Sequence, residues 1–280
     1  MNGVEPVDLL VFGPHPDDIE IDVARHVDLG LRVGLCDLTA GEMGSNGTVE
    51  QRLAEAEAAR EVLGAAWRVN LRWTDRAIGG PEHIRSAAML LRQARPRTVA
   101  IPYWSDRHPD HVAASQVLTE AAFNSGLRRY EPSVPAWKPG RVCYYFINDA
   151  AAPSFVIDVS EAYDRKRRSL ACYVSQFRPA GDQAVGTRLT SPRFQQLIES
   201  RDAQFGALAG VAFAEGLVVR DPVVLSTLVV DPSDGARMNT GAIDQSERAE
   251  RESRRSGAGH GAPASDGARG FRGTKSPGQE

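Results

Sequence analysis

The sequence contains no run of about 18 or more apolar residues, which is the length that a helix needs to cross a membrane. Residues 1–6 include the acidic Glu5 and lack the basic start and apolar continuation of a signal peptide. Positive charge is not in excess either, since 33 Lys and Arg stand against 36 Asp and Glu. We therefore expect a cytoplasmic protein that binds neither membranes nor nucleic acid.

Cysteine is also scarce. The three cysteines, Cys36, Cys143 and Cys172, are odd in number and widely spaced along the chain. Such a set suits neither a disulfide framework nor a cysteine-rich zinc knuckle. We expect reduced and mostly buried thiols.

Short β-rich runs alternate with helical patterns over most of the chain. Strands are predicted at 8–12, 32–37, 69–73, 98–102, 141–148 and 154–159, and helices at 21–29, 50–63, 81–94, 109–124 and 161–173. This alternation predicts an α/β fold of Rossmann-like type, with a mostly parallel sheet covered by helices in a single domain, residues 1–230. Large apolar side chains become rare after Pro232, so residues 231–280 are predicted to form a disordered tail.

Two motifs that carry histidines and carboxylates follow predicted strands. The sequence HPDDIE at 15–20 comes directly after the strand at 8–12, and HPDH at 108–111 comes after the strand at 98–102. In open parallel sheets, ligands bind at the carboxyl ends of the strands, near the point where the strand order reverses. Both motifs are therefore expected at the functional edge of the sheet.

His15 with Asp18, and His108 with His111, are each three residues apart, a spacing that places both side chains of a pair on one helical face. Two neutral imidazoles and one carboxylate, with an open position for water, form a common catalytic zinc site, and the same set suits Fe(II). We therefore predict His15, Asp18 and His111 as metal ligands that activate a water molecule. Asp17 is left as the general base. His108 is left to stabilise the oxyanion and to protonate the departing amine.

Each motif alone also has a purely structural explanation, because proline at the first helical position and acidic residues in the first turn favour the start of a helix. The presence of both motifs, each past the end of a predicted parallel strand, argues for the metal site. The other histidines are predicted to have no metal role: His26 lies within a helix, His83 begins one, and His260 lies in the tail.

In these two motifs the sequence resembles the LmbE/PIG-L family of zinc-dependent N-deacetylases, and the resemblance covers residues 8–230. It is similar in particular to the branch that deacetylates N-acetylglucosaminyl malate in bacillithiol biosynthesis. The segments that carry this narrower similarity are 36–39, 45–48 with Arg52, 75–76, 106–107, 144–148, 175–177 and 214–216. The resemblance implies zinc bound by His15, Asp18 and His111, with Asp17 as the base and His108 as the acid. It also suggests a homo-oligomer.

The resemblance further suggests residues that bind the substrate. Malate carries two carboxylates, and arginine suits their recognition, so Arg52 and Arg107 are candidates, each with a structural ion pair as the alternative. Asn46 is a candidate for binding sugar hydroxyls, although turn formation explains this residue equally well. The sequence departs from the family pattern at Pro14, Asp22, Arg25 and Phe194. The segment that ends in Phe194 replaces one that ends in tyrosine in the family.

The sequence therefore predicts a metal-dependent hydrolase that removes the acetyl group from an N-acetylglucosaminide, with N-acetylglucosaminyl malate as the expected small-molecule substrate. Two alternatives remain open: a related amidase for another acylated amino sugar or thiol conjugate, and a non-catalytic binding protein on the same scaffold. A dinucleotide-binding protein is disfavoured, because residues 13–16 do not supply a Gly-x-Gly-x-x-Gly turn.

Overall fold

The computed structural model describes residues 3–20, 23–182 and 184–224. The chain divides into a compact unit, Met1–Met238, and a segment, Asn239–Glu280, that lies outside the described residues. The predicted tail at 231–280 and the predicted domain boundary at residue 230 lie outside them as well. Within the described ranges, no helix is long and apolar enough to cross a membrane.

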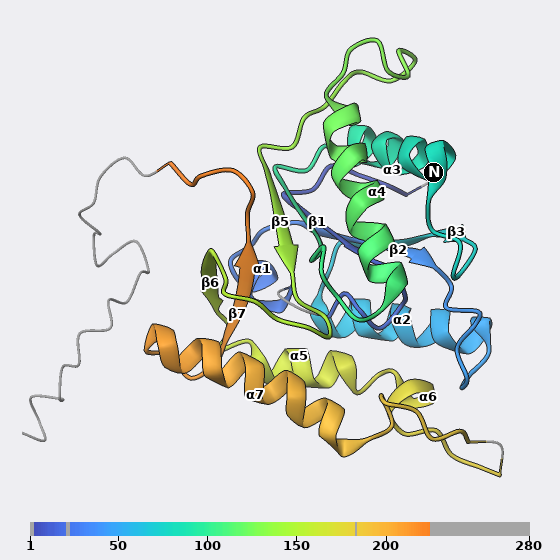
Figure 1. Ribbon diagram of the computed structural model, residues 1–280, viewed down its shortest axis with the longest axis vertical. Helices are drawn as coiled ribbons and strands as arrows, with labels where there is room; N and C mark the ends of the chain where they lie inside the picture. Colours follow the sequence, from blue (N-terminus) through green and yellow to red (C-terminus); the bar gives the residue numbers. More distant parts are fainter. Residues whose placement is uncertain (1–2, 21–22, 183, 225–280) are drawn as a thin grey trace, which may run out of the picture. The chain divides into compact units, whose positions relative to one another are not determined.

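The described residues contain a seven-stranded sheet with helices on both faces (Figure 1). Across the sheet the strand order is β3-β2-β1-β4-β5-β7-β6. The first five strands of the chain run parallel to one another, whereas β7 runs antiparallel to both β5 and β6. The strands are β1 (Leu9–Gly13), β2 (Val33–Thr39), β3 (Trp67–Trp73), β4 (Thr98–Pro102), β5 (Arg141–Tyr145), β6 (Phe155–Asp158) and β7 (Ala214–Val218). The predicted mostly parallel α/β fold is confirmed.

Two layers of helices cover the sheet. The helices are α1 (Val23–Asp28), α2 (Val49–Leu63), α3 (Gly80–Ala94), α4 (Pro109–Ser125), α5 (Tyr163–Leu170), α6 (Val174–Phe177) and α7 (Pro192–Ala209). Figure 1 shows α3 and α4 side by side, away from α2 and α5, which pack against each other. Alternate residues of β1 enter the two resulting cores: Leu10 and Phe12 join the core with α3 and α4, and Leu9 and Val11 join the core with α1 and α2.

The strand order reverses at β1, and this reversal positions the two motifs. From β1 the chain continues to β2 and β3 on one side, and β4 and β5 lie on the other side. The HPDDIE loop follows β1 and the HPDH segment follows β4, so both leave the carboxyl ends of adjacent parallel strands. This is the place where open α/β sheets bind ligands.

The structure adds three elements that the sequence patterns did not predict: α6, α7 and β7. The longest, α7, starts at Pro192, and the hydroxyl of Ser191 caps it by accepting a hydrogen bond from the backbone N–H of Arg193. It packs against β7, where Gly216 leaves room for the ring of Phe205, since a Cβ at Gly216 would lie 2.7 Å from Cε2 of that ring. The elements after residue 173 therefore close one side of the sheet's functional edge.

The three cysteines are mostly buried, as predicted. Cys36 and Cys143 are buried, and Cys172 is half-buried.

Candidate metal centre

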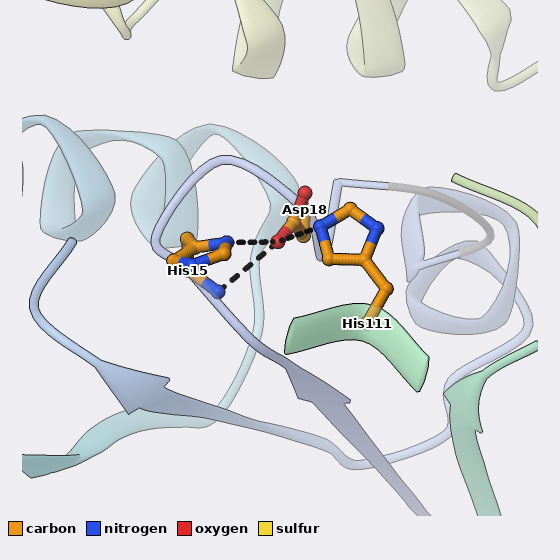
Figure 2. A group of neighbouring side chains, drawn as sticks. All are labelled: His15, Asp18 and His111. Carbon is orange, nitrogen blue, oxygen red and sulfur yellow. Dashed lines mark hydrogen bonds and ion pairs between the residues drawn. The ribbon is translucent and has the colours of Figure 1, made fainter. Parts of the chain in front are cut away.

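The two motif loops bring His15, Asp18 and His111 together, as Figure 2 shows. His15 and Asp18 lie in the loop after β1, and His111 lies in the first turn of α4. Oδ2 of Asp18 lies 3.0 Å from Nδ1 of His15 and 3.4 Å from Nε2 of His111. These contacts are close to the separation of roughly 3.3–3.6 Å that tetrahedral ligands with bonds of about 2.0–2.2 Å require. The three predicted ligands therefore form one candidate metal site.

The surroundings of this site favour positive charge. Burial lowers the pKa of His15, but hydrogen bonds to nearby carboxylates, first to Asp110, outweigh burial and raise that pKa well above its usual value. Burial also opposes the charged form of His111, yet the charge of Asp18 raises the pKa of His111 to about 9. In the metal-free protein, protons on the imidazoles supply this positive charge, and a divalent ion would replace them. The donor set and its electrostatics thus fit a metal cation.

Asp106 and Asn148 fix the orientation of His111. Oδ1 of Asp106 lies 3.1 Å from Nδ1 of His111, and Nδ2 of Asn148 lies 3.4 Å from the same nitrogen. Asp106 also accepts hydrogen bonds from the backbone N and from Nδ2 of Asn148, at 2.9 and 3.0 Å. A carboxylate on Nδ1 leaves Nε2 facing Asp18, which is the way that proteins commonly orient a metal-binding histidine.

A second group of side chains, His15, His108 and Asp110, also has its candidate ligand atoms within 4.8 Å of one another. Arg76 already engages Asp110, because its Nη1 lies 2.9 Å from Oδ1 and its backbone N donates to Oδ2. Nδ1 of His108 accepts the backbone N–H of Asp110 at 3.2 Å. These pairings make the first group the better candidate.

Asp17 lies beside the metal ligands and is held by Arg52. Nη2 of Arg52 donates to Oδ1 of Asp17 at 2.7 Å, and Nη1 donates to the carbonyl oxygen of Gly41 at 2.7 Å. No partner is found for Oδ2 of Asp17 among the described residues. The structure therefore places Arg52 as a partner of Asp17. Its predicted role in substrate binding stays a prediction.

His108 is the N-cap residue of α4, directly before Pro109. Because its Nδ1 accepts a backbone N–H, the neutral ring carries its proton on Nε2. Burial and the charges of His111 and His15 lower the pKa of His108, which favours this neutral form. His108 is thus suited to donate a hydrogen bond from Nε2.

These side chains line a cavity of about 470 Å³. Arg107 lies at this cavity with an exposed side chain, and its predicted role in substrate binding stays a prediction. Another wall comes from α5, α6 and α7 and the segment before α7, and it includes the apolar residues Leu170, Phe177, Leu189, Phe194 and Ile198. The sequence patterns did not predict that these residues line a cavity, nor that Arg201 of α7 lines it as well.

Asn46 is buried and is not among the residues that line the cavity. Its Nδ2 donates to the carbonyl oxygen of Val185 at 2.9 Å, and its Oδ1 accepts the backbone N–H of Val185 at 2.8 Å. The amide therefore ties the loop before α2 to the segment before α7. Its predicted contact with sugar hydroxyls stays a prediction.

Replacing Asn46 by Ala is expected to lower the free energy of unfolding by about 1–3 kcal/mol, because two hydrogen bonds between this buried side chain and the backbone of Val185 are lost. Urea denaturation of the purified variant measures the change. Gln196→Ala, at an exposed position of α7, is the matched control and should differ from the parent by less than about 0.5 kcal/mol. Equal stability of both variants would contradict the tie between the two segments.

Comparison with known proteins supports the predicted family. The profile of the PIG-L family, described as GlcNAc-PI de-N-acetylase, matches residues 10–122, a stretch that contains both motifs. The diacetylchitobiose deacetylase of Thermococcus kodakarensis is 27% identical over 186 residues, which cover 60% of this chain and 70% of the relative. A 1D-myo-inositol 2-acetamido-2-deoxy-alpha-D-glucopyranoside deacetylase of Catenulispora acidiphila is 32% identical over 165 residues, which cover 45% of this chain and 54% of the relative.

Among solved structures, a conserved protein from Thermus thermophilus is similar over its whole length. It is 35% identical, has a TM-score of 0.73, and the match covers 80% of this chain and 100% of that one. The profile match and these relatives support the family predicted from the HPDD and HPDH motifs. Over residues 10–122, a stretch with both motifs, this chain is similar to the PIG-L/LmbE deacetylase family.

Proposed function

We propose that this chain is a metal-dependent N-deacetylase that hydrolyses the acetamido group of an N-acetylglucosaminide. The observation that carries the proposal is the convergence of His15, Asp18 and His111 with Asp17 and His108 on one cavity. The set contains metal ligands, a base and a hydrogen-bond donor, which is a complete group for amide hydrolysis. The relatives named above are deacetylases of acetylated amino sugars by name.

The residues divide the reaction between them. A divalent ion held by His15, Asp18 and His111 would supply a Lewis acid and an activated water molecule. Asp17 accepts the proton of the attacking water at Oδ2, because Arg52 occupies Oδ1. His108 donates a hydrogen bond from Nε2 to the developing oxyanion. The proton that Asp17 took from the water is then passed through His108, as the acid, to the departing amine, so that Asp17 ends as a carboxylate and His108 ends neutral. The products are acetate and the free amino sugar.

For the metal we propose zinc, with Fe(II) as the alternative. Two imidazoles and one carboxylate suit both ions, and ligand type alone does not separate them.

For the substrate we propose N-acetylglucosaminyl malate, which would place the protein in bacillithiol biosynthesis. The sequence segments shared with that branch support this choice. The exposed Arg107 at the cavity supports it too, since it has no acidic partner among the described residues and suits a carboxylate. We further propose a cytoplasmic location and a homo-oligomer, both on the strength of the sequence.

The apolar wall favours a second candidate substrate with an additional sugar ring, such as diacetylchitobiose. Phe177 and Phe194 lie on that wall with ring centroids 6.3 Å apart. Aromatic rings pack well against the apolar faces of sugar rings, so a disaccharide would have a surface to lie on.

The test is release of free amine by the purified protein from N-acetylglucosaminyl malate, from N-acetylglucosamine and from diacetylchitobiose. Each assay is run with the protein as purified, after treatment with a chelator, and after zinc or Fe(II) is added back. We expect chelator-sensitive release that the metal restores, with the malate conjugate as the best substrate. Absence of release from all three compounds by a metal-loaded protein would refute the proposed activity. If the protein prefers diacetylchitobiose, this disaccharide would replace the malate conjugate as the proposed substrate.

A further inference from the structure

Arg201 has a nearly buried guanidinium group in the cavity wall, and one of its nitrogens has no hydrogen-bond partner among the described residues. The residue is only 8% exposed. Nη1 donates to the carbonyl oxygen of Ile147 at 2.9 Å, and Nε lies 3.4 Å from Oδ1 of Asp202. No hydrogen-bond partner of Nη2 is found among the described residues. Nη2 is also absent from the fully buried polar atoms without a partner, so this nitrogen is not fully buried. Because Arg201 lines the cavity, we infer that Nη2 is the part of the side chain that faces it.

Arg107 reaches the same part of the cavity from another element. The hydrogen bonds between Asp106 and Asn148 hold residues 106–107 beside residues 147–148. Arg201 binds the carbonyl oxygen of residue 147 from its own side. The two arginines therefore flank one short stretch of backbone, and both line the cavity there.

The acidic side chains that line the cavity already have partners, and Asp202, which contacts Nε of Arg201, is also bonded by Lys166. Of the carboxylates that line the cavity, Asp17 is paired with Arg52, and Asp18 and Asp75 are paired with His15. Arg107 has no acidic partner among the residues that the structure describes. An anion that enters here would gain charge-assisted hydrogen bonds without displacing an internal partner.

We propose that Arg201 and Arg107 form a carboxylate-binding subsite beside Asn148, and that Arg201 determines specificity for an anionic amino-sugar substrate. The subsite lies close to the reacting centre, because Asn148 also contacts His111. The carboxylate is thus carried by the group attached to the sugar, not by a distant part of the substrate. This inference deepens the proposed deacetylation and rests on it.

The experiment compares Arg201→Gln with the parent protein on two substrates, N-acetylglucosaminyl malate and the uncharged methyl N-acetylglucosaminide. Loss of a hydrogen bond to a charged group is expected to raise KM for the malate conjugate about 10- to 100-fold, with kcat changed by less than about threefold. Both constants for the uncharged substrate should change by less than about threefold. Arg193→Gln removes the same charge from an exposed position of α7 and should leave both substrates unaffected.

A second readout does not depend on turnover. L-malate is expected to raise the melting temperature of the metal-loaded parent and of Arg193→Gln, and to raise that of Arg201→Gln clearly less. If Arg201→Gln does not fold, Arg201→Lys takes its place, and we expect the same selective rise in KM, because a lysine ammonium cannot bind both Ile147 and the ligand in the same geometry.

Equal losses on the two substrates, or an unchanged response to L-malate, would overturn the subsite. If the parent turns over neither substrate, the proposed activity fails, and the malate response alone then decides whether the subsite exists. If the parent turns over both substrates and Arg201→Gln keeps their ratio, the proposed activity stands and the inference about Arg201 fails.

Discussion

Replacing Asp17 by Asn is expected to lower kcat about 10²- to 10⁴-fold while the protein keeps its fold and its metal. The amide has the same shape as the carboxylate and still offers an oxygen to Nη2 of Arg52. It cannot accept the proton of the attacking water. Steady-state release of amine gives kcat, and metal analysis of the same preparation gives the metal content per chain.

Two controls separate loss of the base from loss of the ion pair. Asp149→Asn makes the same chemical change outside the cavity and should leave kcat within about twofold, as expected for a surface position. Arg52→Lys keeps a cation beside Asp17 and should lose less activity than Asp17→Asn, because the base itself remains. Near-normal turnover by Asp17→Asn with a full metal site would remove Asp17 as the base.

The part of the site that the sequence predicted correctly follows from local signals. The motif at 15–20 follows β1 almost at once, the motif at 108–111 follows β4 after a short loop, and the parallel sheet brings the ends of those strands together. His15, Asp18 and His111 converge for this reason alone. The start of α4 was predictable too, because Pro109 and Asp110 are favoured in a first helical turn.

The part that the sequence could not predict depends on contacts between distant residues. Nothing near Arg52 indicates that its guanidinium will hold Asp17, which is 35 residues away. Asn46 pairs with Val185 across 139 residues. The sequence pattern did not reveal β7 either, because this strand contains an acidic residue, Glu215, that is nevertheless buried. Since α7 packs on β7, missing the strand also meant missing Arg201 and the apolar wall of the cavity.

The burial of Glu215 is explained by Lys166, and this pair leads to the largest expected effect on stability. Replacing Lys166 by Met should lower the free energy of unfolding by about 3–5 kcal/mol. The ammonium of Lys166 is buried, bonds Glu215 and lies 2.6 Å from Oδ2 of Asp202. Burial lowers the pKa of Lys166, but the charges of Glu215 and Asp202 outweigh burial and raise it, so the lysine is charged in the folded protein. Without it, two buried carboxylates lose the cation that they share.

Urea denaturation measures this loss, and Lys138→Met at an exposed position makes the same chemical change with an expected effect below about 0.5 kcal/mol. A triple variant tests the cause. Adding Asp202→Asn and Glu215→Gln to Lys166→Met removes the uncompensated charges and keeps the side-chain shapes, so we expect part of the lost stability to return. If the triple variant is no more stable than Lys166→Met, the loss comes from packing around the lysine stem. Charge balance would then not explain why the acidic Glu215 can occupy a buried position in β7.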